Sequence, residues 1–85
     1  MTYTVTILRR AAKALAKLPP RDFERVRDAI RVLGDVPRPA GSKKLVGRDG
    51  WRVRIGAYRV IYEIRDGDLV VLVLDVGDRK DVYRS

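Results

Sequence analysis

Arginine and tyrosine side chains cluster at three places in the second half of this chain. An arginine presents a planar fork of N–H donors that matches a phosphate group, and a tyrosine ring can stack on a base. These residue types at close spacing therefore indicate a partner that carries phosphate, and RNA in particular. The clusters are Arg52-x-Arg54, Tyr58-Arg59 and Gly77-x-Arg79-x-x-x-Tyr83.

The composition excludes several other chemistries. The 85 residues include no cysteine and no histidine, so the chain lacks disulfides, thiolate ligands, the usual zinc ligand and the usual general base. We therefore expect no metal ion and no other cofactor. The apolar share of 46% is typical of a folded protein, and the length predicts a single domain over residues 1–85.

The chain carries no segment that predicts export or membrane insertion. Its N-terminus lacks the continuous apolar core of a signal peptide. The longest apolar run, Leu69–Leu74, is far too short to cross a bilayer. We expect a cytoplasmic protein without a membrane partner.

The positive charge is concentrated in the first three quarters of the chain. Residues 1–62 carry a net charge of +10 and residues 63–85 a net charge of −2, which together give the total of +8. A basic body predicts a polyanionic partner such as nucleic acid, an acidic protein or an anionic membrane. The alternative is a solvated basic surface without a function.

Hydrophobic periodicity predicts the element order β-α-α-β-β-β-β. This order is typical of an α+β domain in which a twisted antiparallel sheet packs against an N-terminal helical hairpin. The expected strands are Tyr3–Leu8, Lys44–Val46, Trp51–Ile55, Tyr58–Arg65 and Leu69–Val76, and the expected helices are Arg9–Leu18 and a second one from Arg21 to a C-cap at Gly34.

Prolines and glycines predict where these elements end. Pro19-Pro20 ends the first helix, because proline disfavours helical geometry in the residue before it. Gly56-Ala57 fits a two-residue hairpin turn. Asp66-Gly67 predicts a type I′ turn, which needs positive φ at both central residues.

The alternation of side chains along a strand predicts where the arginines meet. Arg52, Arg54 and Arg59 should share the face of the sheet opposite the apolar residues, and so converge on the face that the helices leave open. Three guanidinium groups repel one another there, and a bound anion relieves that repulsion. Taken singly, most strand arginines are solvated and most tyrosines are half-buried packing residues, and this is the alternative for each arginine and for Tyr83.

The sequence resembles the RelE/ParE superfamily of toxins from toxin–antitoxin systems, and its RelE-like branch most closely. The resemblance extends over nearly the whole chain. It is carried by the strings YTVTIL, AAKALAKLPP, RVRIGAYRVIYEI, DGDLVVLVL and VGDRKDVYR.

The resemblance implies a compact fold similar to microbial ribonucleases and a ribosome-dependent endoribonuclease that cuts mRNA in the ribosomal A site. Cleavage in that family is metal-independent, because the ribose 2′-OH attacks the adjacent phosphate and leaves a cyclic phosphate. The implied partners are the ribosome, mRNA and a cognate acidic antitoxin similar to RelB.

The resemblance also implies roles for five residues. Arg54, Arg59 and Arg79 would hold the scissile phosphate, Arg52 would stabilise developing charge, and Tyr83 would contact the substrate. Arginine stays protonated in proteins, so Arg52 is a better electrostatic stabiliser than general base, and the base stays unassigned.

Two residues depart from the family pattern. The chain reads LDVGDR where members often read LRVGHR, which places Asp75 and Asp78 at positions of a common arginine and a common histidine. Asp78 could be an ion-pair partner of Arg79, a carboxylate base or a neutral surface change. Two alternative functions follow: a ParE-like inhibitor of DNA gyrase, and a catalytically weak homologue that binds RNA or antitoxin.

Overall fold

The computed structural model describes residues 2–78, which form a five-stranded sheet with two helices and one 3₁₀ turn. Neither helix in this part of the chain has the length and apolar character needed to cross a membrane. The elements are β1 (Thr4–Ile7), α1 (Arg9–Ala16), α2 (Pro20–Val32), β2 (Lys43–Lys44), β3 (Trp51–Ile55), β4 (Tyr58–Arg65), η1 (Asp66–Asp68) and β5 (Val70–Asp78).

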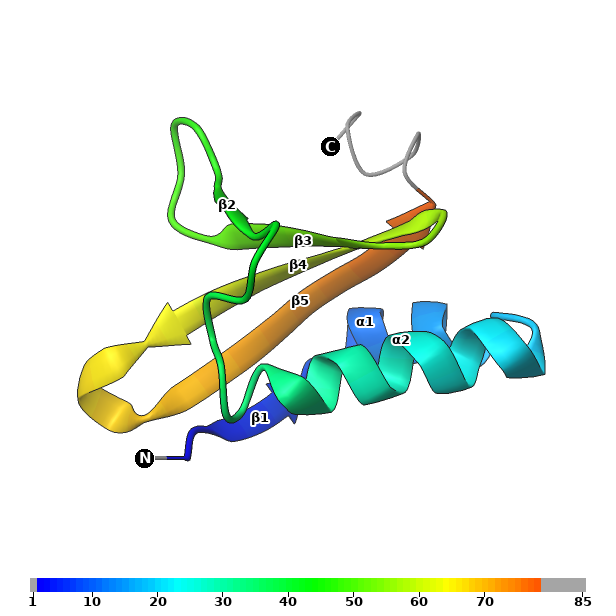
Figure 1. The fold of residues 1–85 in the computed structure, drawn as a ribbon, viewed down its shortest axis with the longest axis horizontal. Helices are drawn as coiled ribbons and strands as arrows, with labels where there is room; N and C mark the ends of the chain where they lie inside the picture. The colour runs from blue at the N-terminus through cyan, green and yellow to red at the C-terminus, as the bar shows by residue number, and fades with distance from the viewer. Residues whose placement is uncertain (1, 79–85) are drawn as a thin grey trace.

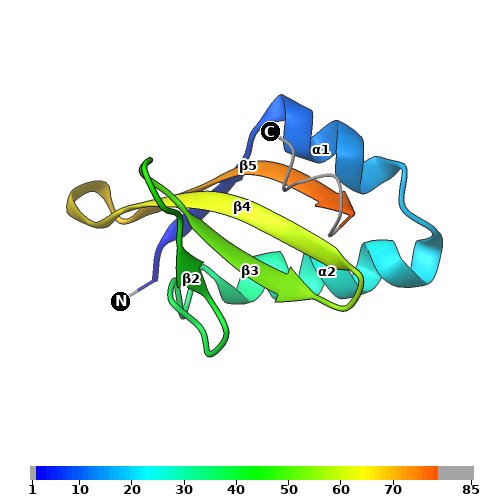
Figure 2. The ribbon, with the colours of Figure 1, turned by 90° about the horizontal axis from the view of Figure 1, so that it is seen from above.

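The strands lie in the order β1-β5-β4-β3-β2, and both helices lie against the same face of the sheet (Figure 1). Viewed from above, α1 runs alongside β5 and α2 runs beneath the β3 side (Figure 2). The α+β architecture with an N-terminal helix pair is therefore confirmed. The sheet is antiparallel, as expected, from β2 through β3 and β4 to β5, whereas β1 pairs parallel to β5. The long connection between these strands permits a parallel pair, which a short hairpin would not.

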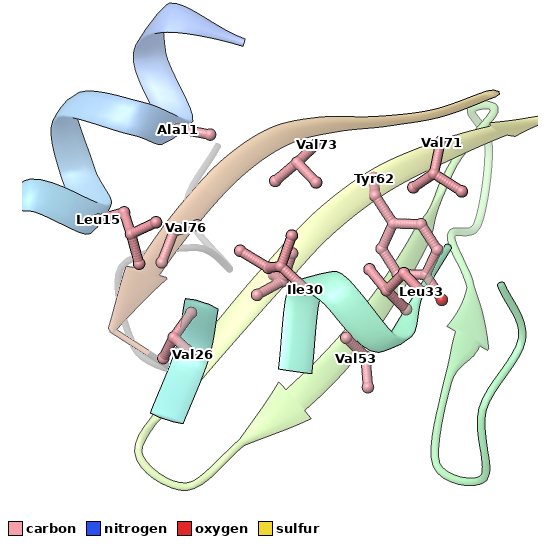
Figure 3. Packing of buried hydrophobic residues seen from close by; sticks show 11 residues of the cluster. Ala11, Leu15, Val26, Ile30, Leu33, Val53, Tyr62, Val71, Val73 and Val76 are labelled. Atoms are coloured by element: carbon pink, nitrogen blue, oxygen red, sulfur yellow. The ribbon is translucent and has the colours of Figure 1, made fainter. Parts of the chain in front are cut away.

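The hydrophobic core fills the space between the helices and the sheet (Figure 3). Val26, Ile30 and Leu33 form one buried stripe along α2, as their spacing predicted. Opposite them, Tyr62 of β4 is completely buried, and its hydroxyl donates a hydrogen bond of 2.8 Å to the carbonyl oxygen of Pro37. This bond connects the centre of the sheet to the segment that follows α2.

A β-bulge in β5 changes which residues face the core. Ile61 lies opposite Asp75 while the next residue, Tyr62, lies opposite Val73, so β5 contains one extra residue at this point. The alternation along β5 is reset there. As a result Val76 is buried in the core, and Gly77 lies beside Arg59 of β4.

Of the two predicted hairpin turns, one is confirmed and the other was wrong. The Gly56-Ala57 turn is confirmed, because Ile55 pairs with Tyr58 and Gly56 has a φ of +61°. The type I′ turn at Asp66-Gly67 was wrong. Residues 66–68 form η1 instead, and Leu69 takes the left-handed conformation with a φ of 53°.

Tertiary contacts explain the different turn at Asp66. Its carboxylate accepts hydrogen bonds from the Tyr3 hydroxyl at 2.5 Å and from Arg38 at 2.9 Å. Both partners are distant in sequence, so the local turn propensity is overridden by contacts that no local pattern contains.

Helix α2 begins at Pro20, one residue before the predicted start. Gly34 does not have the predicted role of a C-cap. Pro19 is the N-cap and Pro20 the first residue of α2, where the missing N–H costs no hydrogen bond. Gly34 follows the helix but does not adopt the left-handed conformation of a C-cap glycine. A Cβ atom at Gly34 would lie 3.0 Å from the carbonyl oxygen of Tyr3, so glycine is needed for the close passage of the N-terminal segment.

Candidate phosphate-binding site

Arg52, Arg54 and Arg59 meet on the face of the sheet opposite the helices, as the alternation predicted. Arg54 lies directly opposite Arg59 in the pairing of β3 with β4. Together with Gly41 and Lys43 these arginines line a cavity of about 220 Å³, several times the ~30 Å³ that a water molecule occupies in the liquid. We call this cavity the arginine pocket. It has room for a phosphate group.

The three arginines differ in depth. Arg59 is buried, with 7% of its surface exposed, whereas Arg52 is partly exposed and Arg54 is exposed. The β5 neighbour of Arg59 is Gly77, which has no side chain to cover the guanidinium. A charge shielded from water interacts more strongly with a bound anion than an exposed one does. Arg59 is therefore the residue best placed to hold a phosphate firmly.

The electrostatics of the arginine pocket favour an anion without ambiguity. Among the residues that the structure describes, its lining contains four cationic side chains and no carboxylate. An anion with several oxygens can accept hydrogen bonds from more than one guanidinium. The arrangement suits binding of phosphate and stabilisation of extra negative charge during its transfer.

Sequence reasoning missed two residues of the pocket and proposed two that cannot be placed. Lys43 lies opposite Arg52 in the short β2–β3 pair, and Gly41 precedes it on the pocket wall. The nearby basic pair Lys43-Lys44 was a signal, but its strand was expected one residue later. Arg79 and Tyr83 lie outside the described residues, so their roles stay predictions.

Asp75 and Asp78 do not line the arginine pocket. Asp75 forms an ion pair of 3.4 Å with Arg10 of α1. Asp78 lies opposite Tyr58 in the sheet. The pKa of the Tyr58 hydroxyl is raised by its hydrogen bond to Asp22, by burial and by the negative charges of Asp22 and Asp78. Since side chains alternate along a strand, Asp78 shares the face of Tyr58 rather than that of Arg59. This position argues against Asp78 as the base of a reaction in the arginine pocket.

The side chains within residues 2–78 provide no group of three or more acidic residues that could hold a metal ion. The described lining of the arginine pocket supplies guanidinium and ammonium groups. Such groups can hold a phosphate and neutralise its developing charge, which is the task that a metal ion performs in other phosphoryl-transfer sites.

The fold and the pocket define a class of protein: a small α+β domain with two helices on one face of its sheet and a cationic, phosphate-sized cavity on the other. The model of the family described as the ParE toxin of the type II toxin-antitoxin system, parDE, matches residues 5–83. The chain belongs to this RelE/ParE family and is a toxin of the type II toxin–antitoxin class.

Individual relatives agree with this assignment. Toxin RelG of Mycobacterium tuberculosis is 36% identical over 88 residues, which cover 99% of both chains. Among solved structures, the toxin–antitoxin complex RelBE2 of Mycobacterium tuberculosis contains a chain with a TM-score of 0.82 and 33% identity, covering 93% of this chain and 100% of that one. The archaeal RelE–RelB complex from Pyrococcus horikoshii gives a TM-score of 0.82 at 35% identity, covering 93% of this chain and 97% of that one.

Proposed function

We propose that this toxin is a ribosome-dependent endoribonuclease that cuts mRNA in the ribosomal A site. The observation that carries the proposal is the arginine pocket, in which Arg52, Arg54, Arg59 and Lys43 surround a phosphate-sized cavity without a carboxylate among its described lining residues. The similarity to toxins named RelG and RelE supports the same proposed function.

The reaction that fits this pocket is attack by the ribose 2′-oxygen on the neighbouring phosphorus. A new bond forms between the 2′-oxygen and phosphorus while the bond from phosphorus to the 5′-oxygen breaks, which leaves a 2′,3′-cyclic phosphate and a 5′-hydroxyl. Phosphorane-like charge develops on the non-bridging oxygens, and Arg59 and Arg54 would stabilise it. The 2′-OH loses a proton and the departing 5′-oxygen gains one, and Arg52 contributes charge rather than proton transfer.

The composition of the pocket supports the proposed dependence on the ribosome. Among residues 2–78, the pocket contains no group that readily accepts a proton near neutral pH. Its cations can stabilise the transition state only if the RNA is already held with the 2′-oxygen in line with the scissile bond. A ribosome that presents the codon in a fixed conformation would supply this alignment.

The direct test uses purified toxin and purified ribosomes that carry a defined mRNA. Primer extension should detect new 5′ ends within the A-site codon, and the same mRNA without ribosomes should stay intact. An Arg65→Ala variant is the matched control, because Arg65 is an exposed arginine of the same strand outside the pocket. Intact mRNA on ribosomes at equimolar toxin would reject the proposal.

A second candidate function is inhibition of DNA gyrase by protein binding. The matching family model is described as a ParE toxin, which favours this candidate, and the arginines of the pocket would then be expendable. A supercoiling assay with purified gyrase separates the two. Loss of supercoiling at submicromolar toxin, together with intact mRNA on ribosomes, would replace the nuclease proposal.

The proposed partner in the cell is an acidic antitoxin. The related chains from Mycobacterium tuberculosis and Pyrococcus horikoshii were solved as toxin–antitoxin and RelE–RelB complexes. The net charge of +8 gives this toxin a field that attracts an acidic protein from a distance.

A further inference from the structure

The proposed cleavage delivers a proton to the departing 5′-oxygen, and the described lining of the arginine pocket holds one side chain that can supply it. An arginine stays protonated in proteins, whereas a lysine ammonium can release a proton. The pocket residues within the described part of the chain are three arginines, one glycine and Lys43. Lys43 is therefore the candidate for proton transfer. A positioned acid of this kind accelerates a reaction by about 100- to 10,000-fold.

The strand order places Lys43 on the opposite side of the pocket from Arg59. Strand β2 forms the edge of the sheet beside β3, and β4 lies on the other side of β3 (Figure 1). Lys43 pairs with Arg52, and Arg59 pairs with Arg54. Neighbouring strands lie ~4.8 Å apart, so β2 and β4 lie about 10 Å apart with β3 between them.

This two-sided arrangement fits an in-line reaction at phosphorus. The attacking and departing oxygens lie on opposite sides of the phosphorus atom in such a reaction. A phosphate held above β3 can therefore present one of these oxygens to Lys43 and the other toward Arg59. Because an ammonium group is a proton donor and not an acceptor, Lys43 suits the departing 5′-oxygen rather than the attacking 2′-OH.

Hydrogen bonds fix the backbone on both sides of Lys43, although its side chain is exposed. Before it, the N–H of Ser42 donates a hydrogen bond of 3.0 Å to the carbonyl oxygen of Pro39. After it, the N–H of Leu45 donates a hydrogen bond of 3.0 Å to the carbonyl oxygen of Gly50, which joins the two ends of the loop between β2 and β3. A catalytic group is effective only when it is held in such a defined position.

The adjacent residue Lys44 has the same charge and exposure but a different position. It pairs with Trp51 rather than with Arg52, and side chains alternate between the faces of a strand. Lys44 lines another cavity, whose described lining includes three acidic residues. The two lysines therefore form a matched pair in which Lys43 alone lines the arginine pocket.

We propose that Lys43 is the general acid of RNA cleavage. As the bond from phosphorus to the 5′-oxygen breaks, the oxygen keeps the electron pair of that bond and takes a proton from the Lys43 ammonium. The product leaves as a 5′-hydroxyl, and Lys43 is left as a neutral amine that regains a proton from water. The proton of the attacking 2′-OH passes to water. The proposal rests on the proposed function, because the reaction that it describes is the cleavage of RNA.

The test compares Lys43→Arg with Lys44→Arg on two mRNA substrates bound to ribosomes. Lys43→Arg keeps the positive charge but cannot donate a proton. One substrate is ordinary mRNA, and the other carries sulfur in place of the 5′-oxygen at the bond that the wild-type toxin cuts. A thiol is far more acidic than an alcohol, so the sulfur departs as a thiolate without a proton. Single-turnover cleavage rates are measured for each variant on each substrate.

Lys43→Arg should cut ordinary mRNA about 100-fold more slowly than the wild type, or worse, which is the usual loss on removal of a general acid. The same variant should cut the sulfur-substituted mRNA at nearly the wild-type rate, and this rescue also shows that the variant is folded. Lys44→Arg should cut both substrates as the wild type does. Arg54→Ala should be slow on both, because it removes charge stabilisation rather than an acid.

Other roles for Lys43 give different results, and each of them overturns the proposal. A wild-type rate of Lys43→Arg on ordinary mRNA would show that Lys43 acts through its charge alone. Equal slowing on both substrates would assign Lys43 to holding the RNA. Rescue of Tyr83→Phe by sulfur, without rescue of Lys43→Arg, would assign the proton to Tyr83.

The wild-type toxin separates failure of this proposal from failure of the proposed function. If the wild type cuts neither substrate on ribosomes, the nuclease proposal fails and the role of Lys43 fails with it. If the wild type cuts ordinary mRNA and sulfur does not rescue Lys43→Arg, the nuclease proposal stands and only the role of Lys43 is overturned.

Discussion

Two cationic surfaces of the molecule differ in size, burial and composition: the arginine pocket, and the groove of about 770 Å³ between α1 and the end of β5, which we call the α1 groove. The pocket is small, its described lining holds no carboxylate, and its central cation, Arg59, is buried. The groove is more than three times as large, its cations are exposed, and they alternate with two aspartates and apolar surface. The two sites lie on opposite faces of the sheet.

This difference shows that net charge alone does not identify a partner. A desolvated cluster of like charges binds one compact anion strongly, because its field is poorly screened. An exposed row of cations beside carboxylates and apolar surface binds a larger partner, and the pattern decides which one. The same +8 chain therefore carries two cationic surfaces of different character.

The variant with the largest expected difference between the two sites is Arg59→Ala. Loss of the buried guanidinium should lower the rate of mRNA cleavage on ribosomes about 100- to 1000-fold, the usual effect of removing one group that stabilises a developing oxyanion. Antitoxin affinity should stay unchanged, because Arg59 lies on the opposite face. Thermal melting of the variant checks its fold. Full cleavage activity in a folded Arg59→Ala protein would contradict the assignment of the pocket.

Arg54→Ala tests the same pocket through its dependence on salt. Binding of single-stranded RNA releases counterions, so removing one phosphate contact should reduce the slope of log K against log salt concentration by about 0.7. The affinity itself should fall several-fold. Filter binding across a salt series measures both quantities. Lys17→Ala is the control in the α1 groove and should leave the slope as it is.

Tyr58→Phe tests whether the two faces of the sheet act independently, because Tyr58 and Arg59 are adjacent in sequence but lie on opposite faces. Tyr58 donates a hydrogen bond of 2.8 Å to Asp22 at the start of α2, while Arg59 beside it faces the pocket. Loss of this partly exposed bond should lower the melting temperature slightly and change mRNA cleavage by no more than about twofold. A loss of cleavage as large as that of Arg59→Ala would mean that the two faces are not independent.

The smallest expected effect is that of Asp66→Asn, which lies in neither site. Two hydrogen bonds hold the pKa of the Asp66 carboxyl below its usual value, and the bond from Arg38 has a larger effect than the bond from Tyr3. Its folded pKa lies below the unfolded value of about 3.9, so the charged form stabilises the fold above that pH and the contribution is lost as the pH falls through the folded pKa.

Melting curves from pH 7 to pH 2 test this expectation for Asp66. The melting temperature of Asp66→Asn should lie slightly below that of the wild type at about pH 7, and the difference should shrink as the pH falls through the folded pKa and the wild-type carboxyl becomes protonated. Cleavage and antitoxin affinity at neutral pH should not change. A gap in melting temperature that widens with acid would contradict the sign of the shift.

Features with a local origin could be predicted from the sequence. The period of two along a strand placed Arg52, Arg54 and Arg59 on one face, and the period of 3.6 placed Ile30 in the core. The Gly56-Ala57 turn followed from the same kind of local preference. These predictions needed no knowledge of which strands are neighbours beyond the hairpin itself.

Features that depend on distant contacts could not be predicted. Lys43 reaches the pocket because of the register of a two-residue strand that follows an irregular segment. The bulge opposite Ile61 places Val76 in the core and Asp78 opposite Tyr58, whereas unbroken alternation from Val73 would have put other residues of β5 there. The turn at Asp66 is fixed by Tyr3 and Arg38, which are remote in sequence. In each case the residue that determines the local structure lies far away in the sequence.

The central claim is that the arginine pocket performs RNA cleavage on the ribosome. Its most direct test maps mRNA 5′ ends across the transcriptome shortly after induction of the toxin without its antitoxin, with Arg59→Ala as the matched inactive variant. The account predicts new 5′ ends in phase with codons for the wild type and none for the variant. Intact mRNA in cells whose growth the toxin has arrested, or phased ends that persist in a folded Arg59→Ala variant, would contradict it.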